Sequence, residues 1–256
     1  MGIKRLVLIS AVLVVLFSTR VYAGEFGPVG PAGKDGQFTL GAGYFLSQTK
    51  IRPGSNDFFD EAEIRRNEVY LQAGYSFTKN WEAYVRLGGA DFRADNAFEF
   101  DSGLKDFSDG MKPFAAVGIR GLAYSNAAFG IGPFLQTSFY SDFKKTENGR
   151  LLGLPVSEEL KFKGLWELDL GAVVQVKLKD VVCYAGPVVY WTRTKVEAKG
   201  TVLGAVFADE ASTFKEKENV GGFGGLRVPL AKGLNLGIEA QAKGRLSVGG
   251  VLTYSF

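Results

Sequence analysis

The sequence predicts an all-β fold: a closed, antiparallel, up-and-down transmembrane β-barrel of about ten strands, with eight or twelve strands as the alternatives. Apolar and polar residues alternate over most of the chain from residue 37 onward, as in half-buried strands. Short and long links between these segments follow one another in turn. Beyond the N-terminal region no apolar stretch reaches the roughly 18 residues of a spanning helix.

Residues 1–23 have the pattern of a secretory signal peptide, with cleavage expected after Ala23. Lys4 and Arg5 precede an apolar run that is short for a membrane-spanning helix, and a retained anchor is the alternative. This segment holds three of the 30 basic residues and none of the 27 acidic ones. Without it the chain is formally neutral, so its charge gives no reason to expect nucleic-acid binding.

Residues 24–36 form a Gly/Pro-rich lead-in to the barrel, which is expected to span residues 37–256. Four glycines in the lead-in recur at every third position: Gly27, Gly30, Gly33 and Gly36. Three or four such triplets are too few for a collagen triple helix. We expect a flexible or polyproline-like segment, with a contact role as the alternative.

The strands and their links follow from the alternation. In the clearest segment, Leu168 and Leu170 share one face, and Glu167 and Asp169 share the other. Tight links are expected near residues 78–80, 125–127, 179–180 and 231–233. Long links are expected near residues 51–62, 93–112, 142–164 and 196–218, and a short link on the same side at 243–244. This alternation of link lengths is typical of outer-membrane barrels, with short periplasmic turns and longer external loops.

The polar face of the strands is expected to line the lumen. Because buried charges need partners, and an exposed apolar face in water promotes aggregation, the apolar face is expected to meet lipid. A soluble barrel with an apolar interior is the less favoured alternative. The expected lumen charge network is either a packed plug or an ion-selecting constriction; it comprises Glu82, Arg86, Arg120, Glu167, Asp169, Arg227 and Glu239.

Aromatic residues gather near both ends of the predicted strands. Phe77 and Trp81 lie near the tight turns, and Tyr140, Trp166 and Trp191 lie near the long links. Two such groups are typical of aromatic belts at the two membrane interfaces. The alternative is that these residues serve only as good strand formers. Two prolines inside predicted strands, Pro133 and Pro187, are expected to mark bulges.

The chain ends on an alternating strand with Val248, Leu252, Tyr254 and the terminal Phe256 on one face. In this it resembles bacterial outer-membrane β-barrel proteins, which typically end in such a strand and a terminal Phe that is read by the barrel assembly machinery. The resemblance covers the chain from about residue 36. It implies a location in the outer membrane of a Gram-negative cell envelope, contact with its lipid, and an assembly-signal role for these four residues.

No catalytic group is evident in the sequence, and neither a cofactor nor a metal is expected. The chain has no histidine, whereas outer-membrane phospholipases, lipid A deacylases and ten-stranded surface proteases resemble one another in using one. The acidic stretch 106–110 does not match a calcium-loop spacing. We therefore expect a non-enzymatic barrel whose long external loops act in envelope structure or surface interaction with an extracellular partner; a small porin-like channel for ions or small solutes is the alternative.

Overall fold

The computed structural model describes residues 26–30, 35–53, 62–203 and 205–256, and the expected signal peptide lies outside these ranges. Ten strands form the barrel wall: β1 (Phe38–Pro53), β2 (Ala62–Thr78), β3 (Trp81–Phe100), β4 (Gly103–Gly121), β6 (Phe129–Tyr140), β8 (Leu154–Leu178), β9 (Val181–Val202), β11 (Val220–Ala231), β12 (Leu234–Ala242) and β13 (Leu246–Ser255). Three further strands are β5 (Tyr124–Ser125), β7 (Phe143–Leu151) and β10 (Ala205–Glu216). Within the described ranges, no helix has the length and apolarity needed to cross a membrane.

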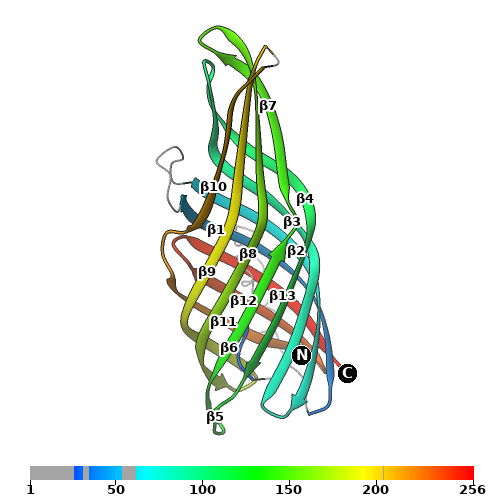
Figure 1. The fold of residues 1–256 in the computed structure, drawn as a ribbon. Helices are drawn as coiled ribbons and strands as arrows, with labels where there is room; N and C mark the ends of the chain where they lie inside the picture. Colours follow the sequence, from blue (N-terminus) through cyan, green and yellow to red (C-terminus); the bar gives the residue numbers. More distant parts are fainter. Residues whose placement is uncertain (1–25, 31–34, 54–61, 204) are drawn as a thin grey trace, which may run out of the picture.

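The ten wall strands close into an antiparallel ring, each paired with its neighbours and β13 paired with β1. In the closing ladder Thr39 lies opposite Ser255 and Leu46 opposite Val248. The ladder ends where the Phe256 N–H donates to the Phe38 carbonyl at 3.1 Å. The tight turns and the C-terminus lie at the same end of the barrel (Figure 1). The predicted ten-stranded, up-and-down barrel is therefore confirmed.

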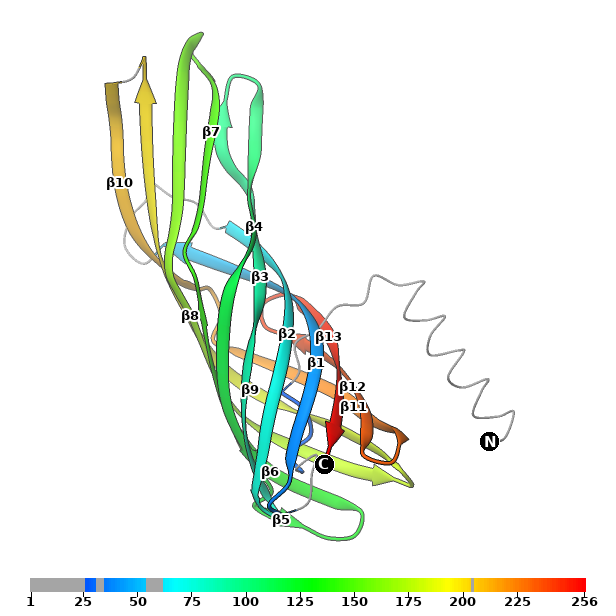
Figure 2. The same ribbon diagram turned by 90° about the vertical axis from the view of Figure 1, so that its right-hand side faces the viewer.

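Three of the expected long loops are strands instead. The links near 93–112, 142–164 and 196–218 form paired β-hairpins that rise well beyond the rest of the wall (Figure 2). We call this part the hairpin extension: residues 91–112 of β3–β4, 143–163 of β7–β8 and 193–216 of β9–β10. Of the fourth link, residues 51–53 continue β1 and 54–61 lie outside the described residues.

The outer face of the barrel wall is apolar. Leu71 is 69% exposed, Leu87 is 61% exposed, and Val117, Leu135 and Leu170 are also exposed. Residues between these positions point inward, and many of them are charged. Since lipid tolerates only closed hydrogen-bond ladders and apolar side chains, this geometry is that of a membrane-spanning barrel of the outer-membrane type. The predicted orientation is confirmed, and the soluble alternative is wrong.

The hairpin extension has the opposite chemistry, with an apolar interior. Five phenylalanines pack there from four strands: Phe92, Phe98, Phe107, Phe143 and Phe162. The Phe92 ring centroid lies 4.5 Å from that of Phe162 and 4.9 Å from that of Phe143. Such a core stabilises strands whose outer face is in water, and it explains why these segments are not loose loops.

Only one of the two strand prolines has the expected bulge beside it. Pro133 lies opposite Ala172 in a continuous β6–β8 register, but on its other side the β4–β6 ladder ends at Arg120 and Phe134 and resumes with β5 at Tyr124 and Ile131, shifted by one residue. Pro187 lies opposite Gly222 without a shift, while the β8–β9 ladder is interrupted beside it and resumes in the same register. Interruption of one neighbouring ladder thus accommodates the missing N–H of each proline.

Candidate functional site

The seven predicted lumen charges all lie on the inner face of the wall. Arg227 is partly buried and the other six are buried. The structure groups them into a Glu82–Arg120 pair, a stacked Arg86, an acidic pair at Glu167 and Asp169, and Glu239 and Arg227, which together with Arg120 hold the N-terminal segment.

Arg86 is bound by amides and aromatic rings near the middle of the lumen. Its Nε donates to Gln72 Oε1 at 2.8 Å, and its Nη1 donates to Gln136 Oε1 at 3.0 Å. Its guanidinium lies 4.9 Å from the Tyr70 ring centroid and 4.8 Å from that of Tyr84. Such stacking with hydrogen bonds holds a buried guanidinium in a fixed place.

Glu167 and Asp169 are neutralised by two cations. Lys243 contacts both carboxylates, with its Nζ 2.7 Å from Glu167 Oε1. Arg66 Nη2 lies 2.9 Å from Glu167 Oε2, and Arg66 is itself buried. Arg66 was missed because it precedes the clearly alternating part of its strand. The alternation of residues 235–243 predicts that Lys243 lies on the polar inner face, and its burial confirms this. Its pairing with Glu167 and Asp169 was not predicted, because the two carboxylates lie on a strand distant in the sequence.

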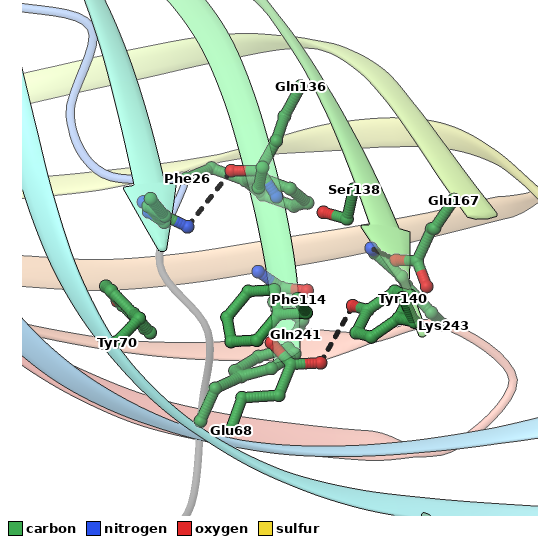
Figure 3. A pocket seen from close by; sticks show the side chains of 13 residues that line it. Phe26, Glu68, Tyr70, Phe114, Gln136, Ser138, Tyr140, Glu167, Gln241 and Lys243 are labelled. Atoms are coloured by element: carbon green, nitrogen blue, oxygen red, sulfur yellow. Dashed lines mark hydrogen bonds and ion pairs between the residues drawn. The ribbon is translucent and has the colours of Figure 1, made fainter. Parts of the chain in front are cut away.

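Tyr140 belongs to this lumen group and not to an aromatic belt. Its hydroxyl donates to Glu68 Oε1 at 2.8 Å (Figure 3), and the Arg66 guanidinium lies 4.5 Å from its ring centroid. The expectation was wrong because Phe139 and Tyr140 are adjacent aromatics, of which only one can face lipid. The register pairs Phe139 with Trp166 on the outer face, so Tyr140 points inward.

The lead-in enters the lumen and is held by its backbone. The N–H groups of Phe26 and Gly27 donate to the two carboxylate oxygens of Glu239, each at 2.9 Å. Arg120 Nη1 donates to the Phe26 carbonyl at 2.7 Å. At the other end, the Gly30 N–H donates to Gln175 Oε1 at 3.0 Å, and Arg227 Nη1 donates to the Gly30 carbonyl at 3.1 Å.

The apolar side chains of this segment fill the lower lumen. Phe26 and Val29 are 1% and 0% exposed. The Phe26 ring centroid lies 4.4 Å from that of Phe134 and 5.0 Å from that of Phe223. Lys243 Nζ lies 4.8 Å from the same ring. Residues 26–30 are therefore part of the packed interior, and the expectation of a flexible linker is wrong for them.

A small cavity remains between the charged groups and the aromatic core of the hairpin extension. Its volume is about 20 Å³, and Glu68, Arg86, Tyr140 and Lys243 are among the residues that line it (Figure 3). A space of this size holds about one water molecule. Side chains and the N-terminal segment thus fill the lumen at this depth, as expected for a narrow barrel.

The remaining predicted residues lie on the outer face. Phe77 and Trp191 are exposed there, and Trp81 and Trp166 are partly exposed. In the last strand Leu252, Tyr254 and Phe256 are exposed and Val248 is partly exposed, while Val251 and Thr253 between them are buried. These positions allow interfacial and assembly roles, which stay predictions. Among the described residues no three potential metal ligands come together.

No protein-family model matches the chain, and no curated protein sequence is similar to it. Among solved structures, the outer membrane protease OmpT from Escherichia coli has a TM-score of 0.49 at 8% identity over 86% of this chain and 97% of that one. The outer membrane protein OprG from Pseudomonas aeruginosa has a TM-score of 0.41 at 11% identity over 90% and 99%. The translocator domain of the autotransporter NalP from Neisseria meningitidis has a TM-score of 0.41 at 10% identity over 88% and 89%.

Similarities at this level do not extend to function, and the barrel itself is established by its closed ladder and its two faces. By its own geometry the chain is a transmembrane β-barrel of the bacterial outer-membrane type, with a filled lumen and a tall hairpin extension.

Proposed function

We propose that this protein is a non-enzymatic outer-membrane barrel, closed to solute passage, that presents the hairpin extension at the cell surface for interaction with an extracellular partner. The filled lumen is the observation that carries the proposal. The N-terminal segment, the buried ion pairs and the phenylalanine core occupy successive levels of the interior. A channel would need a continuous polar path through these levels.

The hairpin extension is suited to a surface role because its hairpins are fixed to one another. The Asp101 carboxylate accepts hydrogen bonds from the N–H groups of Leu152 and Gly153, at 2.9 and 2.8 Å. The Asp101 N–H donates to the Arg150 carbonyl at 2.8 Å. A preformed surface loses less conformational entropy when a partner binds than a free loop does.

The absence of an enzymatic role is supported by the residue types available. The sequence contains no histidine, which is the commonest general base. Its only cysteine, Cys183, precedes the buried Tyr184 and therefore faces outward, toward lipid. A thiol in apolar surroundings is a poor nucleophile, because the thiolate is disfavoured there.

Conductance of the refolded protein in planar bilayers tests the proposal. We expect the wild-type barrel to give no stable conductance steps. Deletion of residues 24–36 together with Arg86→Ala removes the N-terminal segment and a stacked cation, and should produce discrete openings. Arg93→Ala, on the outside of the hairpin extension, is the matched control and should stay closed. Regular steps from the wild-type protein would favour the small-channel alternative.

We also propose that the terminal strand is read by the barrel assembly machinery. The outward row that ends at Phe256 supports this, because it would be open to a partner before the β1–β13 ladder closes. Phe256→Ala should reduce the amount of barrel assembled in cells while leaving refolding into detergent unchanged. An equal loss of folded barrel in cells and in the detergent refolding assay would indicate a general defect in stability.

A further inference from the structure

The lower edge of the hairpin extension carries a basic cluster on its outer face. The cluster lies on four strands that pair in the order β1, β10, β9 and β8 at this level. Its members are Arg52, Lys163, Arg193, Lys195 and Lys215. All five side chains are on the outer surface, because the residues beside them in sequence, such as Ile51, Phe162, Thr194 and Phe214, are buried.

The cluster places like charges directly opposite one another. Lys163 lies opposite Lys195. Arg193 lies opposite Lys215, which in turn lies opposite Arg52 on β1. Like charges at directly opposed positions destabilise a sheet. Three such contacts in one small area therefore oppose folding unless acidic side chains nearby or anions outside the barrel neutralise them.

Internal acids neutralise only the upper part of the cluster. Glu197 Oε2 lies 2.6 Å from Lys163 Nζ, and Glu197 Oε1 lies 2.8 Å from Lys195 Nζ. Among the described residues, no ion pair within 4.0 Å is found for Arg52, Arg193 or Lys215. The row nearest the membrane is thus the one that lacks acidic partners within the described chain.

The height of this row matches the lipid headgroups. Arg193 lies two residues above Trp191 on the same face and opposite Trp166. Two residues span roughly 7 Å along a strand, or about 5 Å along the membrane normal at the tilt of barrel strands. The headgroup layer is roughly 5–8 Å thick on each side. Arg193 and Lys215 can therefore reach phosphate groups of the surrounding leaflet.

A β-bulge brings the two basic strands into this arrangement. Between Lys163 and Trp166, β8 has two residues where β9 has only Thr194. Gly164 adopts a φ of 58°, a left-handed conformation that favours glycine, and Leu165 packs inside. Lys163 and Trp166 consequently both face outward, with the lysine above the ring.

A second group of charges on the outer face, on β2, β3 and the β12–β13 link, shows a different arrangement. It has three arginines and three acids: Arg65, Arg93, Arg245, Glu63, Asp91 and Asp95. Each arginine there has a carboxylate within 4.0 Å, such as Arg65 with Asp95 at 2.5 Å. This balanced face provides an internal control, because it has the same residue types without the excess charge.

We propose that the basic cluster binds phosphate groups of anionic lipid in the outer leaflet around the barrel. Each basic residue contributes a charge at headgroup depth, and together they neutralise more than one phosphate. The inference depends on the membrane placement of the barrel and not on the proposed surface function, so a conducting or non-conducting lumen leaves it unchanged.

Lipid binding to the detergent-solubilised full chain tests this proposal. The probe is a diphosphorylated lipid A, compared with the same lipid after removal of both phosphates, and the readout is bound lipid by native mass spectrometry. At about a fivefold contribution for each basic residue of the row without acidic partners, Arg52→Gln/Arg193→Gln/Lys215→Gln should weaken binding roughly 100-fold. The matched control Arg65→Gln/Arg93→Gln/Arg245→Gln should change it less than about threefold.

Two outcomes would overturn the proposal. One is equal binding of the phosphorylated and dephosphorylated lipids to the wild-type protein, which decides the matter even if the triple variant fails to fold. The other is a loss of lipid binding in the control variant equal to that in the triple variant. Inorganic pyrophosphate and heparin are added as competitors: strong binding of heparin without retention of the lipid would assign the cluster to a soluble polyanion and contradict a lipid partner.

Discussion

The barrel wall and the hairpin extension are built from the same strands, yet their interiors differ in chemistry. In β3 the inward residues near the tight turn are Glu82, Tyr84 and Arg86, whereas farther along the same face they are Phe92, Phe98 and Phe100. The outer face changes in the opposite sense, from Val85 and Leu87 to Asp91 and Arg93. The period of two holds up to Ala94 and again from Phe98, with an irregularity in the ladder between these two residues.

This difference shows that the surroundings determine which face is apolar. Where lipid covers the wall, apolar side chains face outward and the lumen can hold charges that are paired. Where water covers it, the hydrophobic effect drives apolar side chains inward and charges remain outside. The change on β3, between Leu87 and Asp91, therefore marks the external boundary of the membrane.

The largest loss of stability is expected from the substitution Lys243→Met in the barrel wall. Lys243 is buried between two carboxylates, and removal of one partner of a buried ion pair costs roughly 3–5 kcal/mol. The comparison is Lys105→Met in the hairpin extension, where Lys105 lies 3.7 Å from Glu147 in an exposed pair worth at most about 1 kcal/mol. Denaturant unfolding in lipid vesicles, followed by tryptophan fluorescence, gives the change in the free energy of unfolding for each variant. A similar loss of unfolding free energy in the two variants would contradict the contrast between the buried ion pairs of the wall and the exposed ones of the hairpin extension.

A smaller effect is expected when a charge is moved across the boundary on β3. Val85→Arg places a charge on the lipid-facing surface and should destabilise the barrel by about 2–4 kcal/mol in vesicles. Arg93→Val is the reverse change eight residues along the same face, and should alter stability by less than about 0.5 kcal/mol. Equal stability of the two variants in vesicles would place both positions in the same medium.

The smallest effect concerns pH. Hydrogen bonds from Lys144 and Lys161 lower the pKa of Glu159 to about 2, and those from Lys163 and Lys195 lower the pKa of Glu197 to about 2. A lowered pKa in the folded state means that these contacts stabilise the sheet at pH values above the ordinary pKa of 4.5, and that the stabilisation is lost as the pH falls toward 2.

Since both groups are exposed, salt should weaken this effect. Carboxyl titration by NMR is the measurement, and Glu159→Gln is the control for assignment. We expect Glu159 to titrate well below 4.5 at low ionic strength and to move back toward 4.5 at high salt. Titration near 4.5 at low salt would mean that the lysine contacts are not maintained in solution.

The sequence was sufficient to predict the ten strands and their orientation, because apolar residues on one face and charged residues on the other are unambiguous in segments such as 166–178. It was not sufficient for the hairpin extension. There, charged residues such as Arg93 and Asp95 led to the prediction of a loop for residues 93–112. A signal was nevertheless present, since Phe98 and Phe100 keep the period of two.

The candidate site was predicted only in part. The inward charges Glu82, Arg120 and Glu239 were identified, and the Glu82–Arg120 ion pair agrees with the expected pairing, but the partners of Glu239 were not predicted. Glu239 binds the backbone N–H groups of residues 26 and 27, and backbone groups leave no trace in the residue types. Tyr140 could not be placed because two adjacent aromatics make either alternation acceptable, and only the register with β8 decides between them.

The central claim is that the outer face of a single strand passes from lipid into water. It is tested most directly by nitroxide labels at Leu87→Cys and Arg93→Cys, each with Cys183→Ala, in the protein reconstituted into vesicles. We predict that oxygen relaxes the label at position 87 more strongly, and that a water-soluble nickel chelate relaxes the label at position 93 more strongly. Equal access of the nickel chelate to both positions would contradict the account.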